Sequence, residues 1–343
     1  MPIRLPLVLV LSLLLAGCGW FRGSRTEDPS SGALYREQAN AELVEEALLT
    51  PPYPEEELDS LAIWQAPGGA RWVIATAKVS DHLLVFDAGN GELLSRHGGH
   101  GKAPGLFNRA NGIAVFGDLV FVAERDNHRV QVMSLPDFRP LATFGENELR
   151  SPYGLWLHPL DDERIEILVT DSYLADVKTL TVPPLAELGQ RIKRYELLID
   201  GDAITARHTG SFGDTSEDGA LRMVESIAGD VEHQRLLIAE EDNRVGTTLR
   251  VYDFAGRFTG LNLPEKHFKA QAEGVALWAC EDGDGYWIAT DQSTRNTVFH
   301  IFDRRELAYL GSFAGRTVAN TDGIALDRVG STRFPAGALY VVH

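Results

Sequence analysis

Short segments in which apolar and polar residues alternate fill the chain from about residue 59 to residue 343. Three of them follow one another at residues 272–277, 285–292 and 297–303, with turn-forming residues between them. Alternation with a period of two is typical of half-buried β-strands, and polar or glycine-rich breaks are typical of the turns between them. The pattern predicts consecutive strands joined by short turns.

Related triplets recur along the chain, and we interpret them as six repeated units. First strands are expected to begin near residues 62, 112, 154, 226, 274 and 323, and second strands at 72–76, 119–123, 165–170, 236–239, 286–290 and 338–342. Third strands are expected at 83–87, 130–134, 249–253 and 297–303. Units of roughly 40 to 70 residues have the spacing of propeller blades, which stack in a ring because one small sheet cannot bury both of its faces. The predicted fold is all-β, a six-bladed β-propeller over residues 58–343.

Two places depart from the regular repeat. Charged residues and prolines at 183–195 predict an insertion in the third or fourth unit. The sequence ends at His343, inside the last unit, so that either an N-terminal strand completes the last blade or the blade is short.

The N-terminus predicts a secretory leader. Arg4 is followed by an apolar run, residues 5–15, that is too short to span a bilayer. Small residues before Cys18 resemble a bacterial lipobox, so residues 1–18 are expected to be a lipoprotein signal peptide, with Cys18 carrying the lipid. The alternative is an ordinary signal peptide that contains a cysteine. Gly19 resembles lipoproteins directed to the outer membrane, so we expect a lipid-anchored protein of the cell envelope, facing the periplasm or the exterior.

Residues 19–57 are expected to link the lipid to the propeller. The first part of this segment is mostly polar and is interpreted as a tether. Residues 33–49 are rich in alanine, glutamate and leucine, with Ser31 placed to cap a helix and Pro51 placed to end it. The segment therefore predicts a short helix before the propeller.

The charge of the chain limits its partners. The 343 residues include 49 acidic and 32 basic side chains, a net charge of −17, which argues against binding to nucleic acid or to an anionic lipid surface. The excess of carboxylates is compatible with a soluble, self-repelling surface or with a site for hard divalent cations, which prefer several oxygen ligands. The sequence contains no Gly-x-Ser-x-Gly elbow, no Walker loop and no His-Glu-x-x-His pair.

Polar residues stand directly before most of the expected first strands. In a propeller the starts of the innermost strands face the central channel, so residues that are far apart in sequence meet there. The residues at these starts are Asp59, Tyr153, Glu225, Glu273 and Asp322. Carboxylates held close together repel one another unless cations neutralise them. The set is therefore a candidate calcium cluster; the alternative is that each carboxylate bonds backbone amides at its own strand start.

Charged residues also follow the expected second strands. Lys78, Arg125 and the run Glu240-Glu241-Asp242 occupy these places. A lysine or arginine beside metal-bound carboxylates can hold phosphate oxygens. Taken singly, each of them is more typical of a surface salt bridge.

The order of these motifs resembles that of the β-propeller phytases, the calcium-dependent phosphatases of bacteria. The resemblance covers about residues 59–343 and rests on residues 58–64 with 76–78, 153–154, 224–225 with 238–242, 272–274 with 286–292, and 321–324 with 334–337. The resemblance implies that calcium is held by Asp59, Glu225, Glu241, Glu273 and Asp322. It also implies that phosphate contacts Lys78, Arg125 and Tyr153.

Some positions depart from the family pattern. Ser60 replaces the second aspartate of an opening pair, Ser172-Tyr173 replaces a lysine–glutamate pair, and Ser226 replaces a glycine. A second resemblance, over residues 101–133, is to the NHL repeat, a propeller unit used mostly in binding scaffolds. In that repeat the equivalents of Asn127 and His128 form a turn that fixes blade packing.

Two functional hypotheses follow. In the first, the protein is a calcium-dependent phosphomonoesterase that hydrolyses phytate or a related ester: the metal would lower the pKa of a bridging water, while Lys78, Arg125 and Tyr153 would stabilise charge on phosphate oxygens. In the second, it is a lipid-anchored propeller that acts as a non-catalytic binding or assembly scaffold at the cell envelope. The departures at Ser60, Ser172 and Tyr173 favour the second hypothesis.

Overall fold

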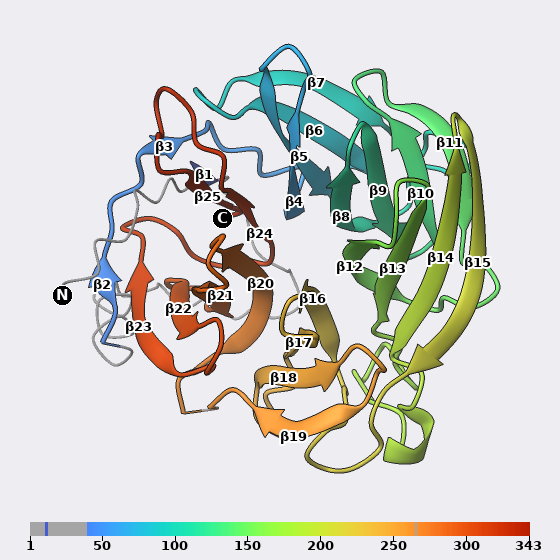
Figure 1. Cartoon of the computed structure of the whole chain (residues 1–343), viewed down its shortest axis with the longest axis vertical. Coiled ribbons are helices and arrows are strands. Elements are labelled where there is room, and N and C mark those ends of the chain that lie inside the picture. Colours follow the sequence, from blue (N-terminus) through green and yellow to red (C-terminus); the bar gives the residue numbers. More distant parts are fainter. Residues whose placement is uncertain (1–10, 13–39, 265) are drawn as a thin grey trace.

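The computed structural model describes residues 11–12, 40–264 and 266–343, which form an all-β propeller (Figure 1). The sheets are arranged around a central axis, and the first strand of each sheet lies nearest that axis. The one helical element in the described part of the chain is a 3-10 turn, η1 (Leu185–Glu187). The predicted all-β propeller is confirmed.

Five of the sheets are blades whose four antiparallel strands follow the sequence from the axis outward, and the sheet of blade 5 carries β2 (Glu42–Leu43) as a fifth strand, in parallel, at its outer edge. Blade 1 contains β4 (Leu58–Gln65), β5 (Arg71–Ala77), β6 (His82–Asp87) and β7 (Leu93–Gly98), and blade 2 contains β8 (Ala110–Phe116), β9 (Leu119–Glu124), β10 (Arg129–Ser134) and β11 (Arg139–Phe144). Blade 3 contains β12 (Pro152–Pro159), β13 (Arg164–Asp171), β14 (Ile192–Asp200) and β15 (Ala203–Phe212). Blade 4 contains β16 (Val224–Asp230), β17 (Arg235–Glu240), β18 (Thr248–Asp253) and β19 (Phe258–Asn262), and blade 5 contains β20 (Gln271–Ala279), β21 (Gly285–Gln292), β22 (Val298–Asp303) and β23 (Tyr309–Ala314).

The sixth place in the ring holds a shorter sheet. It contains two strands, β24 (Ile324–Asp327) and β25 (Ala338–Val341), so the prediction of six full blades is wrong and the structure has five. The ring still closes, because β24 contacts both β20 and β4, and the Gly323 amide donates to the Asp59 carbonyl oxygen at 2.9 Å. Leu48 and Tyr53 pack against the hydrophobic core between this short sector and blade 1. An N-terminal segment thus takes part of the space that outer strands would fill.

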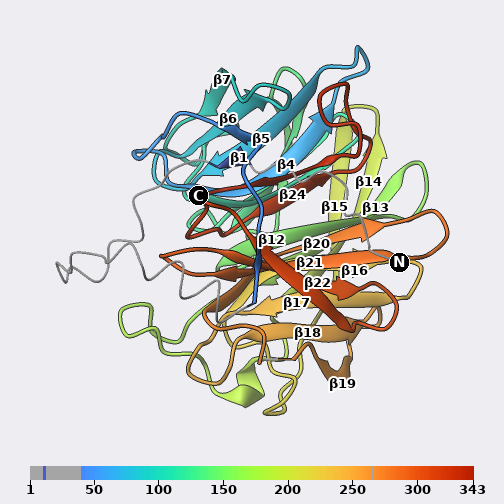
Figure 2. The same cartoon turned by 90° about the vertical axis from the view of Figure 1, so that its left-hand side faces the viewer.

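The hydrophobic core is divided among the interfaces between neighbouring sheets. Between blades 4 and 5, for example, Leu237 of one sheet and Trp287 of the next belong to one buried cluster. In the side view of Figure 2, these sheets lie one above the other like layers. At the closing interface, Tyr340 of the short sector shares a cluster with Phe86 of blade 1. Each sheet therefore buries its faces against its two neighbours, as expected for a propeller.

Residues 40–49 contain two short strands in place of the predicted helix. β2 (Glu42–Leu43) adds in parallel to the outer edge of β23, and β3 (Leu48–Leu49) pairs in parallel with β1 (Leu11–Ser12). The Glu46 carboxylate accepts the amides of Thr317 and Val318 at 2.7 and 3.1 Å. The helix prediction is wrong here because the unpaired edge of β23 offers backbone hydrogen bonds that outweigh helix propensity. Residues 33–39 of that helix lie outside the described residues.

The predicted insertion lies in blade 3, where residues 172–191 connect β13 to β14. Its end is fixed by the buried Arg191, whose guanidinium donates to the carbonyl oxygens of Asp171, Tyr173, Leu221 and Arg222. Apart from β1, the predicted signal peptide and Cys18 lie outside the described residues. Within the described ranges, no helix has the length and apolar character needed to cross a membrane.

Candidate functional site

A β-bulge at the start of each inner strand builds the site. In all five blades the register between first and second strand shifts, for instance between Val224 and Ile227 in blade 4. Two residues per blade therefore stand outside the ladder, which turns their side chains away from the sheet. The first residues of these pairs, with their equivalent in the short sector, are Asp59, Asn111, Tyr153, Glu225, Glu273 and Asp322. The bulge explains why polar residues precede the apolar strands in the sequence.

The second residue of each pair is small because the inner strands converge. A Cβ atom on Gly112 would lie 2.1 Å from the carbonyl oxygen of Tyr153, and one on Gly323 would lie 2.6 Å from that of Asp59. The backbone of one sector thus touches the bulge of the next, which brings the polar side chains into one ring. Ser226, which replaces a glycine of the family pattern, is a small residue at one of these positions.

A second set of side chains follows the ends of the second strands. Leu58 pairs with Ala77 and Val224 with Glu240, so the next residue, Lys78 or Glu241, stands beside the bulge of its own blade. The equivalent positions in the other blades hold Arg125, Ser172 and Gln292. The site is therefore built from two tiers of residues at equivalent positions in successive blades.

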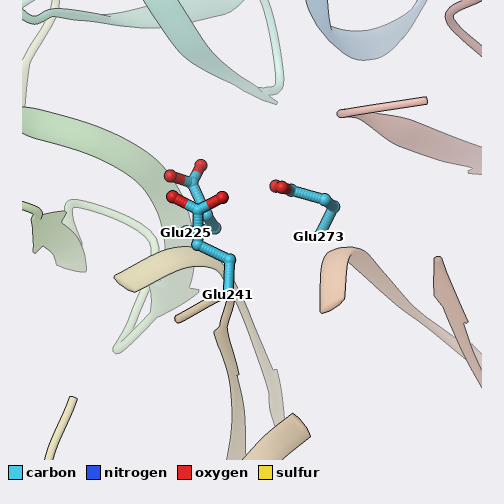
Figure 3. Close-up of side chains that lie close together, drawn as sticks. All are labelled: Glu225, Glu241 and Glu273. Atoms are coloured by element: carbon cyan, nitrogen blue, oxygen red, sulfur yellow. The ribbon is translucent and has the colours of Figure 1, made fainter. Parts of the chain in front are cut away.

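Glu225, Glu241 and Glu273 form an acidic group that we call the glutamate cluster (Figure 3). One carboxylate oxygen of each lies within 4.8 Å of the others. Glu225 and Glu241 come from blade 4, and Glu273 points toward them from blade 5. The Gln271 amide donates to Glu241 Oε2 at 2.6 Å, whereas the buried Glu225 Oε2 has no hydrogen-bond partner among the described residues.

Burial and mutual repulsion raise the pKa values of these acids. Burial, followed by the charges of Glu241 and Glu273, holds the pKa of Glu225 well above its ordinary value. Burial and the charges of Glu241 and Asp322 do the same to the pKa of Glu273, and burial also raises the pKa of Glu241. Three acids in this arrangement can all stay ionised only if positive charge is bound beside them.

Asp59 and Asp322, which we call the aspartate pair, share Lys78. The lysine Nζ donates to Asp59 Oδ1 at 2.8 Å and to Asp322 Oδ2 at 3.2 Å. The Tyr153 hydroxyl donates to Asp59 Oδ1 at 3.3 Å, and the Gln292 amide donates to Asp322 Oδ1. Burial raises the pKa of Asp322 to about 6, although Lys78 opposes the shift. Because Tyr153 belongs to blade 3 and Asp59 to blade 1, these side chains meet at the axis of the ring.

Seven of the eight residues proposed from the sequence for calcium and phosphate are thus gathered around the axis of the ring. The charges of Asp59, Glu225, Glu273 and Asp322 all act there on the pKa of Tyr153. Arg125 has a different environment. Its guanidinium donates to both carboxylate oxygens of Asp126, at 2.7 and 3.1 Å, and one third of its side chain is exposed. The structure therefore gives Arg125 a surface ion pair.

The residues that depart from the family pattern have contacts of their own. Ser60 Oγ donates to Asp59 Oδ2 at 3.2 Å. Tyr173 is buried, donates its hydroxyl to the Glu187 carbonyl oxygen at 2.7 Å, and contacts the guanidinium groups of Arg150 and Arg191 at 4.0 and 4.1 Å. Tyr173 consequently anchors the insertion of blade 3.

The turn of the NHL-like segment has the structural contacts that the resemblance implies. Asn127 Nδ2 donates to the Gly101 carbonyl oxygen at 2.8 Å. His128 has a left-handed φ of 57°, and its Nδ1 lies 2.7 Å from the carbonyl oxygen of Arg150, which leads into blade 3. The turn thus ties blade 2 to its neighbour.

Three amide residues of the site were missed by sequence reasoning, and the first is Asn111, the bulge residue of blade 2. Gln292 bonds the aspartate pair and Gln271 bonds the glutamate cluster. Gln292, the last residue of β21, is one residue beyond the pairing partner of the residue that precedes the bulge, as Lys78 and Glu241 are in their own blades. That equivalence is the signal by which Gln292 could have been found, whereas Gln271 lies two residues before its bulge and has no such marker.

The residues of the glutamate cluster fit a divalent cation. Hard divalent cations prefer carboxylate and carbonyl oxygens, which this cluster supplies from three residues. A buried carboxylate oxygen without a partner, such as Glu225 Oε2, is costly unless it binds something. The donor set and this unpartnered atom agree with a site for a cation such as calcium.

Comparison with known proteins finds matches to two family models and to solved structures. Residues 107–133 match the family model of the NHL repeat, and residues 189–340 match that of Phytase. Similar solved structures include hydrazine synthase of Kuenenia stuttgartiensis, with 13% identity, a TM-score of 0.50 and coverage of 87% of this chain and 75% of that chain. They also include a chain of a nidogen/laminin complex, with 11% identity, a TM-score of 0.51 and coverage of 85% and 87%.

At these identities the solved structures show a shared fold and nothing more about function. The Phytase match is more informative, because it contains the whole glutamate cluster and Asp322, whereas Asp59, Lys78 and Tyr153 precede it. The predicted resemblance to the β-propeller phytases is thereby confirmed for residues 189–340, the part of the chain that carries most of the acids of the site.

Proposed function

We propose that this protein is a calcium-dependent phosphomonoesterase whose active site is the ring of polar side chains around the propeller axis. The observation that carries the proposal is the glutamate cluster, three buried or half-buried carboxylates within 4.8 Å in the Phytase-like part of the chain, with Lys78 and Tyr153 in the same ring. The resemblance to phytases supports phytate or a related phosphate monoester as the substrate class.

The glutamate cluster would hold the metal. When bound, calcium supplies Lewis-acid polarisation of a phosphoryl oxygen and lowers the pKa of water. Lys78 presents an ammonium group and Tyr153 a hydroxyl group in the same ring, and both can donate to the phosphate oxygens on which charge develops. Burial, followed by the charge of Asp59, holds the pKa of Tyr153 well above its ordinary value, so the hydroxyl stays protonated and remains a donor.

A proton acceptor is also available. The pKa of Asp322, raised to about 6, lies close to neutral pH, where a carboxyl group both accepts and releases protons readily. Asp322 is therefore suited to take a proton from the attacking water. Arg125 would contact phosphate only after leaving Asp126.

The alternative function is a binding or assembly scaffold, which we propose would be anchored to the cell envelope by a lipid at Cys18. The ion pair of Arg125 and the structural contacts of Tyr173 favour it. Within the described part of the chain, these contacts leave Lys78 as the cation that the structure places in the ring. A site with one lysine among five acids depends on bound metal for any affinity toward phosphate.

Phosphate release separates the two functions. The full chain, purified in detergent, is assayed with phytate and with 4-nitrophenyl phosphate, in calcium and in chelator, and its fold is checked by circular dichroism. We expect release in calcium, loss of release in chelator and recovery when calcium is restored. Glu273→Ala should lose most of this activity, whereas Glu281→Ala, an exposed residue in a turn of the same blade, should retain it. If the folded protein releases phosphate from neither ester, the enzymatic function is refuted and the scaffold function is retained.

A further inference from the structure

The two acidic parts of the ring differ in how fully their oxygens are bonded. Every carboxylate oxygen of the aspartate pair has a donor. Asp59 Oδ1 accepts from Lys78 and Tyr153, and Oδ2 accepts from Ser60. Asp322 Oδ1 accepts from Gln292, and Oδ2 accepts from Lys78. The aspartate pair is therefore satisfied by side chains of the protein itself.

The glutamate cluster is not satisfied in this way. It brings three carboxylates together, and the donor that the structure gives it is the uncharged amide of Gln271. The buried Glu225 Oε2 has no partner among the described residues. The unbalanced negative charge of the ring is thus concentrated on this side, in blades 4 and 5.

We propose that Lys78 is a built-in counter-cation that reserves the aspartate pair, so that divalent cations bind the glutamate cluster and not Asp59 and Asp322. This inference shares its metal site with the proposed function but concerns where the metal is allowed to bind. It assigns to Lys78 the role of limiting the number of metal ions in the ring.

The burial of the ion pairs supports this role. The side chain of Lys78 is 4% exposed and that of Asp59 is fully buried, so the ammonium has little water to replace its carboxylate partners. A divalent cation between Asp59 and Asp322 would break both ion pairs and place the lysine charge beside its own. A cation at the glutamate cluster leaves both ion pairs of Lys78 intact, and the lysine charge reaches this cluster only as a weaker contribution at Glu241. The glutamate cluster is therefore the favoured cation site.

Calcium titration by isothermal calorimetry on the full chain in detergent tests the proposal without any turnover. Lys78→Met keeps most of the side-chain volume and removes the charge, so the aspartate pair should gain metal: we expect one more calcium per chain than in the wild type. Lys193→Met is the matched control, because Lys193 is also 4% exposed and lies 4.0 Å from a fully buried aspartate, Asp171, in blade 3. It should leave the number of bound calcium ions unchanged.

A second pair of variants keeps the test valid if Lys78→Met fails to fold. In the wild-type background, Asp322→Asn should leave the stoichiometry unchanged and the dissociation constant within about threefold, whereas Glu273→Gln should weaken binding strongly. A calcium ion lost in Asp322→Asn, or a folded Lys78→Met with the wild-type stoichiometry, would overturn the proposal.

The outcomes also separate this inference from the proposed function. If calcium binds in the expected pattern but no phosphate ester is hydrolysed, Lys78 retains its role and the enzymatic function is wrong. If neither the wild type nor Lys78→Met binds calcium, the inference is refuted together with the metal dependence.

Discussion

Neutralising Glu273 should have opposite effects on stability with and without calcium. At a separation of about 4.8 Å and an effective dielectric constant of about 20, two ionised carboxylates repel by about 3.5 kcal/mol. Glu273 belongs to two such pairs, which gives about 7 kcal/mol if all three acids stay charged. Protonating Glu273 at pH 7 costs about half as much, about 3–3.5 kcal/mol, because pH 7 lies 2.5 units above its ordinary pKa of 4.5 and each unit corresponds to about 1.4 kcal/mol. Without metal, protonation of Glu273 therefore costs less than keeping all three acids charged, which agrees with the raised pKa of Glu273.

The variant Glu273→Gln removes this cost, because glutamine is neutral without binding a proton. In chelator at pH 7 it should therefore be about 3 kcal/mol more stable than the wild type. With an unfolding entropy of about 2.1 cal/mol/K per residue, this corresponds to a melting temperature about 4 °C higher. Calcium at about 100 times its dissociation constant should add about 2.7 kcal/mol, again about 4 °C, to the wild type, and much less to the variant.

Differential scanning calorimetry in chelator and in calcium measures both shifts. Glu281→Gln, in an exposed turn of the same blade, is the matched control and should follow the wild type under both conditions. A Glu273→Gln variant that melts at or below the wild-type temperature in chelator, and that keeps the full calcium shift, would refute the reasoning.

Three further predictions concern pH, the interface between blades and the convergence of the strands. In chelator, the melting temperature should fall as pH rises from about 5 to 7. Between its ordinary pKa of 3.8 and its raised pKa of about 6, the Asp322 carboxyl binds more protons in the folded form than in the unfolded chain, and this stability is lost as pH rises through the raised value; melting temperatures that rise over this range would contradict it. Arg304→Met should lower the free energy of unfolding in urea by about 3–5 kcal/mol without changing calcium binding, because the fully buried Asp230 loses its two bonds to Arg304, of 2.7 and 2.8 Å. As the control, Arg257→Met changes an exposed ion pair and should lower it by less than about 1 kcal/mol. Gly112→Ala should cost about 1–3 kcal/mol or more in the same assay, whereas Gly68→Ala, with nothing within 4 Å of its added methyl group, should be nearly neutral.

The alternation of apolar residues was sufficient to predict the propeller, because each inner strand carries the same pattern of a polar residue, a small residue and an apolar run. The same pattern placed Asp59, Glu225, Glu273 and Asp322 at equivalent positions. The bulges turn the first three of these toward the axis of the ring. The sequence pattern therefore predicted correctly which inner-strand start each of these residues occupies.

The partners of the side chains could not be predicted in this way. Lys78 and Arg125 hold equivalent positions after their second strands, yet Lys78 reaches the aspartate pair while Arg125 bonds Asp126, the next residue. Which carboxylate each cation bonds depends on three-dimensional distances, and the spacing of residues along the chain does not reveal them. The failed helix at residues 40–49 has a similar cause, because the edge of β23 that recruits β2 lies about 270 residues later in the sequence.

The closure of the ring has a consequence for how the protein is made. Lys78 and Asp322 are 244 residues apart, and their contact joins the first blade to the last sector. A chain that folds from its N-terminus has all three members of the glutamate cluster in place once blade 5 has formed, but the aspartate pair forms only when the final sector docks on the first blade. Since long-range closure is the slow, entropically costly step of folding, the glutamate cluster would be complete before the ring is shut.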